Sequence, residues 1–181
     1  MSIKKKAVTC LVAAIISIMG VKYAGEVRTS VRGLELIGDT EGCRRDPYLC
    51  PANVLTAGIG STSGISVSHL YSDAEIAAMW VEDLQRAERC INKNFHGDEM
   101  NQNQFDAMAS AAFNMGCLGL MWFTDSRGVR QRTTIWKHAQ ARSWAAMCNR
   151  LPDFVNGGGR KLPGLVKRRE AERVMCLEPV T

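Results

Sequence analysis

The sequence has few of the residues that build metal or nucleotide sites. It contains only three histidines, His69, His96 and His138, and it lacks both a C-x-x-C pair and an H-E-x-x-H motif, which argues against the common zinc sites. No phosphate-binding loop of the GxxxxGKS/T form is present, and the G-I-G at Gly58–Gly60 is too short for a nucleotide site. We therefore expect no metal and no cofactor, and we interpret the histidines as surface residues.

Acidic residues are absent before Glu26, whereas lysines occupy positions 4, 5, 6 and 22. Without these lysines the chain carries 19 basic and 18 acidic groups, so the net charge of +5 belongs mainly to the N-terminus. A nearly neutral body argues against a nucleic-acid partner, which would require phosphates to be neutralised. The length of 181 residues and the 46% hydrophobic content fit one globular unit, built of one or two lobes.

The apolar run near the N-terminus is too short for an ordinary transmembrane helix, which needs about 20 apolar residues. This run, residues 7–21, follows a lysine cluster and ends at Lys22, which is the form of a signal peptide. Lys22 or Tyr23 occupies the place where signal peptidase requires a small residue. We therefore expect residues 1–25 to be an uncleaved signal anchor in the inner membrane and residues 26–181 to be the exported domain; a cleaved signal peptide is the alternative.

The anchor implies the Sec export machinery as a partner and the periplasm as the destination of the body, an environment in which disulfides form. Lysines inside and the body outside also follow the positive-inside rule. We expect the protein first to be tethered to the inner membrane and then to be released into the periplasm as a monomer.

The body has the pattern of an α+β protein that is mostly helical. A helical pattern from Val31 stops at Gly42, and a capping box at Ser72–Glu75 begins a long helix that we expect to end near Cys90. Residues 46–65 have the composition of a small hairpin. We expect a polar loop at 92–103, helices at 104–115, after Ser126, at 143–150 and at 165–176, and a glycine loop at 157–159.

The segment from Glu41 to Ser61 is the strongest candidate for chemistry. Glu41 ends a helix beside a glycine, where a carboxyl group can be partly buried and can hold its proton near neutral pH. Cys50 follows nine positions later and Thr56 six positions after that, within a glycine-containing hairpin. Glutamates at helix ends are common on surfaces, so the spacing carries the prediction.

This spacing, Glu then eight residues, Cys then five residues, Thr, resembles the catalytic region of phage lysozymes (endolysins) of glycoside hydrolase family 24. The surrounding EG, DPY and T-x-G-x-G also match. NQNQFDAMASAAFNMG at 101–116 and LPGLVKRREAER at 162–173 resemble two further motifs of that family, so the likeness covers residues 31–177. One departure is Ser61, which stands where the family usually has histidine, and this places the local stability of the small lobe in question.

The resemblance implies a lysozyme-like two-lobe fold, with a small α/β-hairpin lobe, a long connecting helix and a helical second lobe. It implies an N-acetylmuramidase acting on peptidoglycan, with Glu41 as general acid, Thr56 positioning water, and Cys50 as base, charge stabiliser or transient nucleophile. Substrate-binding positions are then Gly60 and the run Phe113, Asn114, Met115 and Gly116. Core packing is an equal alternative for Phe113 and Met115. Arg168 or Arg169 is expected to approach Glu41.

Seven cysteines leave one thiol without a partner. Signal-anchor-release endolysins, which this chain resembles at Cys10, Cys43 and Cys50, are controlled by disulfide exchange. The resemblance implies a Cys43–Cys50 bridge that inactivates the tethered enzyme until Cys10 takes Cys43 and frees Cys50. A simple packing role for Cys10 is the alternative.

The other four cysteines allow three pairings, and sequence alone does not separate them. Cys148 and Cys176 lie near the ends of two helices joined by the glycine loop. We therefore favour a Cys148–Cys176 bridge, which leaves Cys90 with Cys117.

Two rival functions follow from the same residues. One is a Cys-His hydrolase or amidase of the cell wall, with Cys50 as nucleophile and His69 or His138 as base. The other is a membrane-tethered wall-binding protein without activity. A basic cluster at Lys161, Lys167, Arg168, Arg169 and Arg173 is expected to meet the anionic wall.

Overall fold

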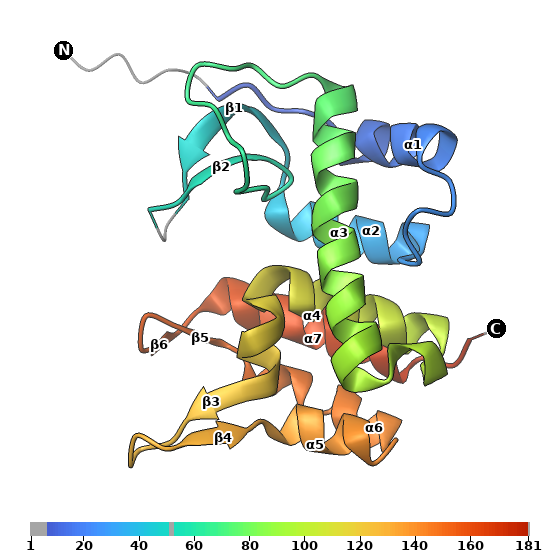
Figure 1. Ribbon diagram of the computed structural model, residues 1–181, viewed down its shortest axis with the longest axis vertical. Helices are drawn as coiled ribbons and strands as arrows, with labels where there is room; N and C mark the ends of the chain where they lie inside the picture. The colour runs from blue at the N-terminus through green and yellow to red at the C-terminus, as the bar shows by residue number, and fades with distance from the viewer. Residues whose placement is uncertain (1–6, 51–52, 181) are drawn as a thin grey trace. The chain divides into compact units, whose positions relative to one another are not determined.

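The computed structural model describes residues 7–50 and 53–180. Lys4, Lys5 and Lys6, the basic start of the expected anchor, lie outside the described residues. The chain forms two compact units (Figure 1). Unit 1 contains the described residues up to Val27 and the segment Ile37–Asp83, whereas unit 2 contains Arg28–Leu36 and the described residues from Leu84 onward.

Unit 1 combines short helices with one hairpin. Its elements are α1 (Val12–Lys22), the last part of α2 (Val31–Glu41), the antiparallel strands β1 (Arg44–Leu49) and β2 (Leu55–Gly58), and the first part of α3 (Asp73–Phe95). The N-terminal segment adds an edge to the hairpin, since the N–H of Cys10 donates to Cys43 O at 3.2 Å and the N–H of Arg45 donates to Val8 O at 2.7 Å. Ile15 and Met19 of α1 are buried. The segment expected to be the anchor is therefore folded into unit 1, and no helix among the described residues is long and apolar enough to cross a membrane.

Gly38 allows α1 to lie close to α2. A Cβ atom at Gly38 would be 2.3 Å from Cγ1 of Val12, so only glycine fits without a shift. We predict that Gly38→Ala destabilises unit 1 by about 1–3 kcal/mol through overpacking, although alanine is the better helix former. Urea unfolding of the single variants and of Gly38→Ala/Val12→Ala measures the coupling, because the second substitution removes the clashing methyl group.

Gly20→Ala is the matched control, because a Cβ at Gly20 has nothing within 4 Å. It should leave stability unchanged or raise it by up to about 1 kcal/mol. Equal effects of Gly38→Ala in the presence and absence of the Val12 methyl groups would contradict this packing.

Unit 2 is helical around one core. It contains the remainder of α2 and α3, then α4 (Gln102–Met121), α5 (Thr134–Gln140), α6 (Trp144–Cys148) and α7 (Pro163–Leu177). Short 3-10 turns occur at η1 (Gly97–Glu99) and η2 (Leu151–Asp153), and two hairpins pair β3 (Trp122–Thr124) with β4 (Arg130–Arg132) and β5 (Asn156–Gly157) with β6 (Arg160–Lys161).

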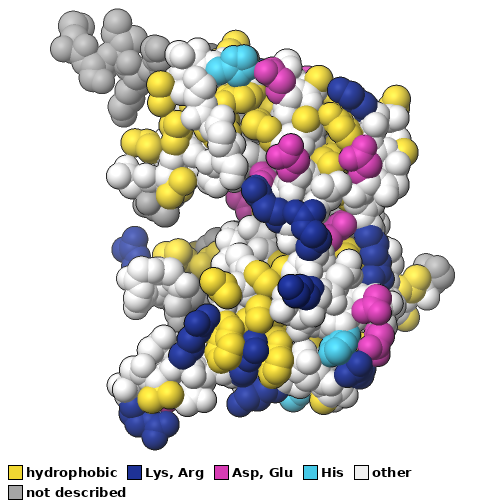
Figure 2. All heavy atoms as spheres, in the orientation of Figure 1, with side chains coloured by type: hydrophobic (Ala, Val, Ile, Leu, Met, Phe, Trp, Pro, Cys, Tyr) yellow, Lys and Arg dark blue, Asp and Glu magenta, His cyan; other side chains and the backbone are white. Residues whose placement is uncertain are grey.

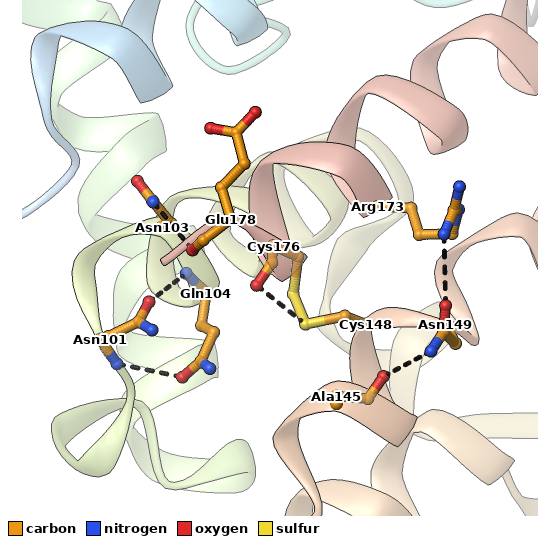
Figure 3. The surroundings of a disulfide bond; sticks show 9 residues. All are labelled: Asn101, Asn103, Gln104, Ala145, Cys148, Asn149, Arg173, Cys176 and Glu178. Atoms are coloured by element: carbon orange, nitrogen blue, oxygen red, sulfur yellow. Dashed lines mark hydrogen bonds between the residues drawn. A yellow bond between two sulfur atoms is a disulfide. The ribbon is translucent and has the colours of Figure 1, made fainter. Parts of the chain in front are cut away.

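Two disulfides lie within unit 2. Cys148 of α6 is bonded to Cys176 of α7 (Figure 3), and Cys90 is bonded to Cys117. This is the pairing favoured by the sequence. Beside the first bridge, the Arg173 guanidinium donates to the Oδ1 of Asn149 at 3.3 Å, which adds a polar contact between the same two helices. Each bridge is expected to stabilise the exported protein by about 2–4 kcal/mol.

Several sequence expectations need correction. The long helix continues past Cys90 to Phe95, because Ile91 and Phe95 are both fully buried, so the expected loop at 92–103 shrinks to a short turn region. The segment after Ser126 is first the turn and strand of a hairpin, and helix begins only at Thr134. The polar composition of residues 92–95 favoured a loop, but the burial of Ile91 and Phe95, four residues apart, stabilises this segment as helix.

The prediction that the basic cluster meets the anionic wall is also wrong for two of its residues. Arg168 and Arg169 are buried, with 4% and 0% of their surfaces exposed. Both pair with the fully buried Glu172, at 3.1 and 2.7 Å, and the Ser110 hydroxyl donates to the same carboxylate at 2.7 Å. Burial raises the pKa of Glu172, and the two guanidinium groups oppose that shift. These two arginines therefore belong to the core of unit 2 and are not surface groups.

Candidate active site

Glu41 is placed by the end of α2. It is the last helical residue and is half-buried, and Gly42 ends the helix in the left-handed conformation at φ +72°, where its N–H donates to Gly38 O at 2.8 Å. Glycine adopts this conformation without a steric cost. The chain then turns directly into Cys43 and β1, so the carboxyl group lies at the base of the hairpin.

Cys50 and Thr56 are placed by the register of that hairpin. Tyr48 lies opposite Thr56, and the N–H of Cys50 donates to Val54 O at 2.9 Å, which continues the pairing by one step. Side chains two apart on a strand, and those directly opposite, share a face. Tyr48, Cys50 and Thr56 therefore lie on one face of the hairpin.

Glu41 and Cys50 both affect the pKa of Tyr48. Burial raises the pKa of the Tyr48 phenol, and the negative charges of Glu41 and Cys50 raise it further, whereas Arg44 lowers it. The Glu41 and Cys50 charges therefore influence the ionisation of the Tyr48 phenol. The sequence motif DPY contains Tyr48, but no functional role was predicted for this residue. Its position two residues before Cys50, on the same face of the hairpin, could have identified it.

Arg44 completes the polar surroundings of Tyr48. Its guanidinium lies 4.3 Å from the centre of the Tyr48 ring and contacts the Asp46 carboxylate at 2.5 Å. This arginine holds the pKa of Asp46 below its usual value, and Asp46 also accepts the N–H of Val8 at 2.7 Å. The N-terminal segment is thus bonded to the same strand that carries the candidate site.

Thr56 has a specific hydrogen-bonding state. Its side chain is buried, with 3% exposed, and its hydroxyl donates to Val54 O at 3.0 Å. Because the single proton is used in this way, the remaining lone pairs can only accept a hydrogen bond. A water molecule bound here would donate a hydrogen bond to Thr56 and keep an oxygen lone pair free for attack.

The glycine turn after β2 is stabilised in spite of the Ser61 departure. Ala57 and Ser61 exchange two backbone hydrogen bonds across the turn, where Gly58 and Gly60 have positive φ angles of +63° and +77°. The buried Ser61 hydroxyl donates to the Asp83 carboxylate at 2.5 Å. Ser61 therefore links the turn to α3 through a hydrogen bond. The assignment of Gly60 to substrate binding stays a prediction.

The second-lobe candidates lie where α4 is interrupted. Gly116 breaks the helix at φ +73°, and Phe113 and Met115 are half-buried against the core of unit 2, which supports the packing alternative for both. Asn114 is exposed, and its Oδ1 accepts a hydrogen bond from Arg169 at 2.6 Å. Their contact with saccharide, and the approach of Arg168 or Arg169 to Glu41, stay predictions.

Disulfide chemistry in unit 1 leaves one thiol. Cys10 is bonded to Cys43, whereas Cys50 is half-buried and takes part in no disulfide. His69 pairs with Glu75 at 2.8 Å, and His138 lies on α5 in unit 2. Among residues 7–50 and 53–180 no group of three His, Cys, Asp or Glu side chains is arranged to hold a metal ion.

The chain matches known proteins over most of its length. Residues 38–172 match the model of the phage lysozyme family. The chain belongs to the phage lysozyme family. The SAR-endolysin of Escherichia phage P1 is 53% identical over 93% of this chain and 90% of its own length, and that of Haemophilus phage HP1 is 42% identical over 83% and 81%.

Two solved structures extend the likeness to the fold. The active form of the P1 phage endolysin Lyz has a TM-score of 0.89 at 51% identity, covering 95% of this chain and 96% of Lyz. The secreted inactive form of the same protein has a TM-score of 0.63 at 53% identity, covering 82% and 95%. The expected lysozyme-like α+β fold is confirmed, and this chain is a phage endolysin with the hydrolase activity of a lysozyme.

Proposed function

We propose that this endolysin hydrolyses the β-1,4 bond between N-acetylmuramic acid and N-acetylglucosamine, with Glu41 as the general acid. The observation that carries the proposal is the position of Glu41 at the end of α2, directly before a hairpin that bears Tyr48, Cys50 and Thr56 on one face. Glu41 protonates the glycosidic oxygen, and the bond breaks through an oxocarbenium-like state. Thr56 accepts a hydrogen bond from the water that attacks the sugar, and the Cys50 thiolate stabilises the cation and takes up the proton that this water loses.

A turbidity assay on cells stripped of their outer membrane separates this proposal from a non-catalytic wall-binding protein. The endolysin should clear the suspension, whereas a wall-binding protein would coat the cells and leave the turbidity unchanged. A thiol amidase would also clear the suspension, so the bond that is cut must be identified from the products.

We further infer that the described conformation is the released, active one. In the tethered protein Cys43 is bonded to Cys50. After release the Cys10 thiolate attacks the Cys43 sulfur; the Cys10–Cys43 bond forms, the Cys43–Cys50 bond breaks, and Cys50 leaves as thiolate. No oxidant is consumed. The Cys10–Cys43 bridge, the buried Ile15 and Met19, and the higher TM-score with the active form of Lyz support this state.

The exchange predicts which thiol is reactive. Alkylation of the released protein under native conditions, followed by peptide mass spectrometry, should label one cysteine per chain, and that cysteine should be Cys50. Label at Cys10, with Cys43 and Cys50 recovered as a linked peptide, would contradict the assignment of this conformation to the released enzyme.

The names of the relatives and the charge pattern support the same location. The lysine-flanked segment tethers the inactive protein to the inner membrane, and release places it in the periplasm beside peptidoglycan. This order requires residues 7–22 to exchange a membrane environment for the edge of β1 and the surface of α2.

A further inference from the structure

The β3–β4 hairpin of unit 2 carries a stack of aromatic and basic side chains that the proposed chemistry does not use. Trp122 lies directly opposite Arg132 in the register, and Arg130 is the diagonal neighbour on the same face. The Arg132 guanidinium carbon lies 3.7 Å from the Trp122 ring centre and 4.1 Å from that of Trp136, so the guanidinium is held between two indoles. Arg130 lies 4.6 Å from the Trp122 ring. We call these four side chains the Trp–Arg stack.

The base of the hairpin is fixed to the core. Thr133, which follows β4, is buried; its hydroxyl donates to Leu120 O and its N–H donates to Met121 O at 3.1 Å. The next buried residue, Ile135, has no exposed surface. The stack is therefore held on a rigid support, which is the arrangement that lowers the entropic cost of binding a ligand.

The positive charges of the stack have no internal counter-charge among the described residues. The structure gives neither Arg130 nor Arg132 an ion pair, and Nη1 of Arg132 is buried without a hydrogen-bond partner there. The carboxylate in the hairpin, Asp125, instead accepts the N–H groups of Arg127 and Val129, both at 2.9 Å. Arg130 is exposed and Arg132 is half-buried, so their guanidinium donors other than the buried Nη1 of Arg132 are suited to an external carboxylate.

The surroundings favour a peptide over a bare anion. Figure 2 shows hydrophobic and basic side chains next to one another over β3, β4 and the start of α5. Phe123 and Val129 of the same hairpin are exposed by 49% and 48%. A ligand here meets two guanidinium groups and adjoining apolar surface, which suits a short chain that bears carboxylates.

We propose that the Trp–Arg stack binds the carboxylates of the stem peptides of peptidoglycan. This inference rests on the proposed function, because the glycan that Glu41 cleaves carries these peptides. The stack then contributes affinity for peptide-bearing strands through contacts away from the bond that is cut, and it contributes nothing to strands without peptides.

The first test measures binding without catalysis. The probe is the tripeptide L-alanyl-γ-D-glutamyl-meso-diaminopimelate, titrated into the full chain carrying Glu41→Gln while the indole N–H signals of Trp122 and Trp136 are followed by NMR. Converting the carboxylates of the probe into carboxamides should weaken binding about tenfold or more. Arg132→Gln and Arg130→Gln should each cause a loss of similar size.

Arg127→Gln is the matched control, since it removes one charge from the same hairpin at a residue that is exposed and paired with Asp125. It should change affinity less than twofold. Because Arg130 is exposed, its variant tests the site even if Arg132→Gln disturbs the hairpin. Equal binding of the tripeptide and its carboxamide, or preference for phosphatidylglycerol vesicles over the tripeptide, would overturn the proposal.

The second test compares two substrates. Arg132→Gln should lower the rate on peptide-bearing glycan relative to the rate on glycan stripped of peptides, and Arg127→Gln should leave this ratio unchanged. An unchanged ratio for Arg132→Gln would overturn the proposal. If the proposed function itself is wrong, neither substrate yields glycan fragments, yet the NMR titration still decides the peptide site.

Discussion

Glu41→Gln is expected to lower the rate of peptidoglycan hydrolysis by about 1,000-fold, because an amide cannot donate the proton that the leaving oxygen needs. The side chain is half-buried at the end of α2 and the substitution keeps its size, so the free energy of unfolding should change by less than about 0.5 kcal/mol. The release of soluble muropeptides from purified walls measures the rate, and urea unfolding measures the stability.

Glu35→Gln is the control for this loss. Glu35 is an exposed residue of the same helix, so its substitution removes an equal charge outside the candidate site. It should retain nearly full activity. A Glu41→Gln variant that still lyses walls within about tenfold of the native rate would favour a thiol hydrolase in which Cys50 is the nucleophile.

Cys10→Ser is expected to leave the released protein inactive, because no thiol remains to take Cys43 away from Cys50. Lysis should fall to background in the absence of reductant and should return when a dithiol reduces the Cys43–Cys50 bridge. The structure described here has a Cys10–Cys43 disulfide and no disulfide at Cys50, as expected after the exchange. Growth curves of cells that express the variant, together with non-reducing peptide mapping, measure both effects.

Cys43→Ser should have the opposite effect, since Cys50 then has no bridge to Cys43 and the enzyme is active early. The double variant Cys10→Ser/Cys43→Ser is the matched control: it removes the same attacking thiol as Cys10→Ser but also the bridge that locks Cys50. It should be active without reductant. A soluble, active Cys10→Ser protein with Cys43 bonded to Cys50 would contradict the exchange.

The local elements of the candidate site were predictable from sequence because each has a short-range cause. Gly42 stops α2 directly after Glu41, and the composition of 46–65 requires a hairpin, so the spacing of Glu41, Cys50 and Thr56 already placed them in adjacent elements. The favoured bridge between Cys148 and Cys176 followed in the same way from two neighbouring helix ends.

Features that depend on long-range packing were not predictable. The burial of Arg168 and Arg169 depends on Glu172 and on Ser110, which lies far away in the sequence, whereas a basic run alone resembles a surface. The stacking of Arg132 between two tryptophans depends on the register of β3 with β4, and β4 lies in the segment after Ser126 that the sequence pattern predicted to be helical.

The docking of the N-terminal segment on unit 1 was not predictable from the sequence either. An apolar run after lysines predicts a membrane segment, and nothing local indicates that Val8 and Cys10 also pair with the edge of β1. The fit depends on Gly38, a small residue in another helix, which leaves space for Val12. Under the proposed release from the membrane, one sequence has to satisfy two environments, which accounts for a run that is short and rich in small residues.

Mass spectrometry of the muropeptides released from purified peptidoglycan tests the central claim most directly. The account predicts disaccharide-peptide products with N-acetylmuramic acid at the reducing end, and their absence in the Glu41→Gln digest. Free stem peptides accompanied by uncut glycan strands, produced equally by the native protein and by Glu41→Gln, would contradict it.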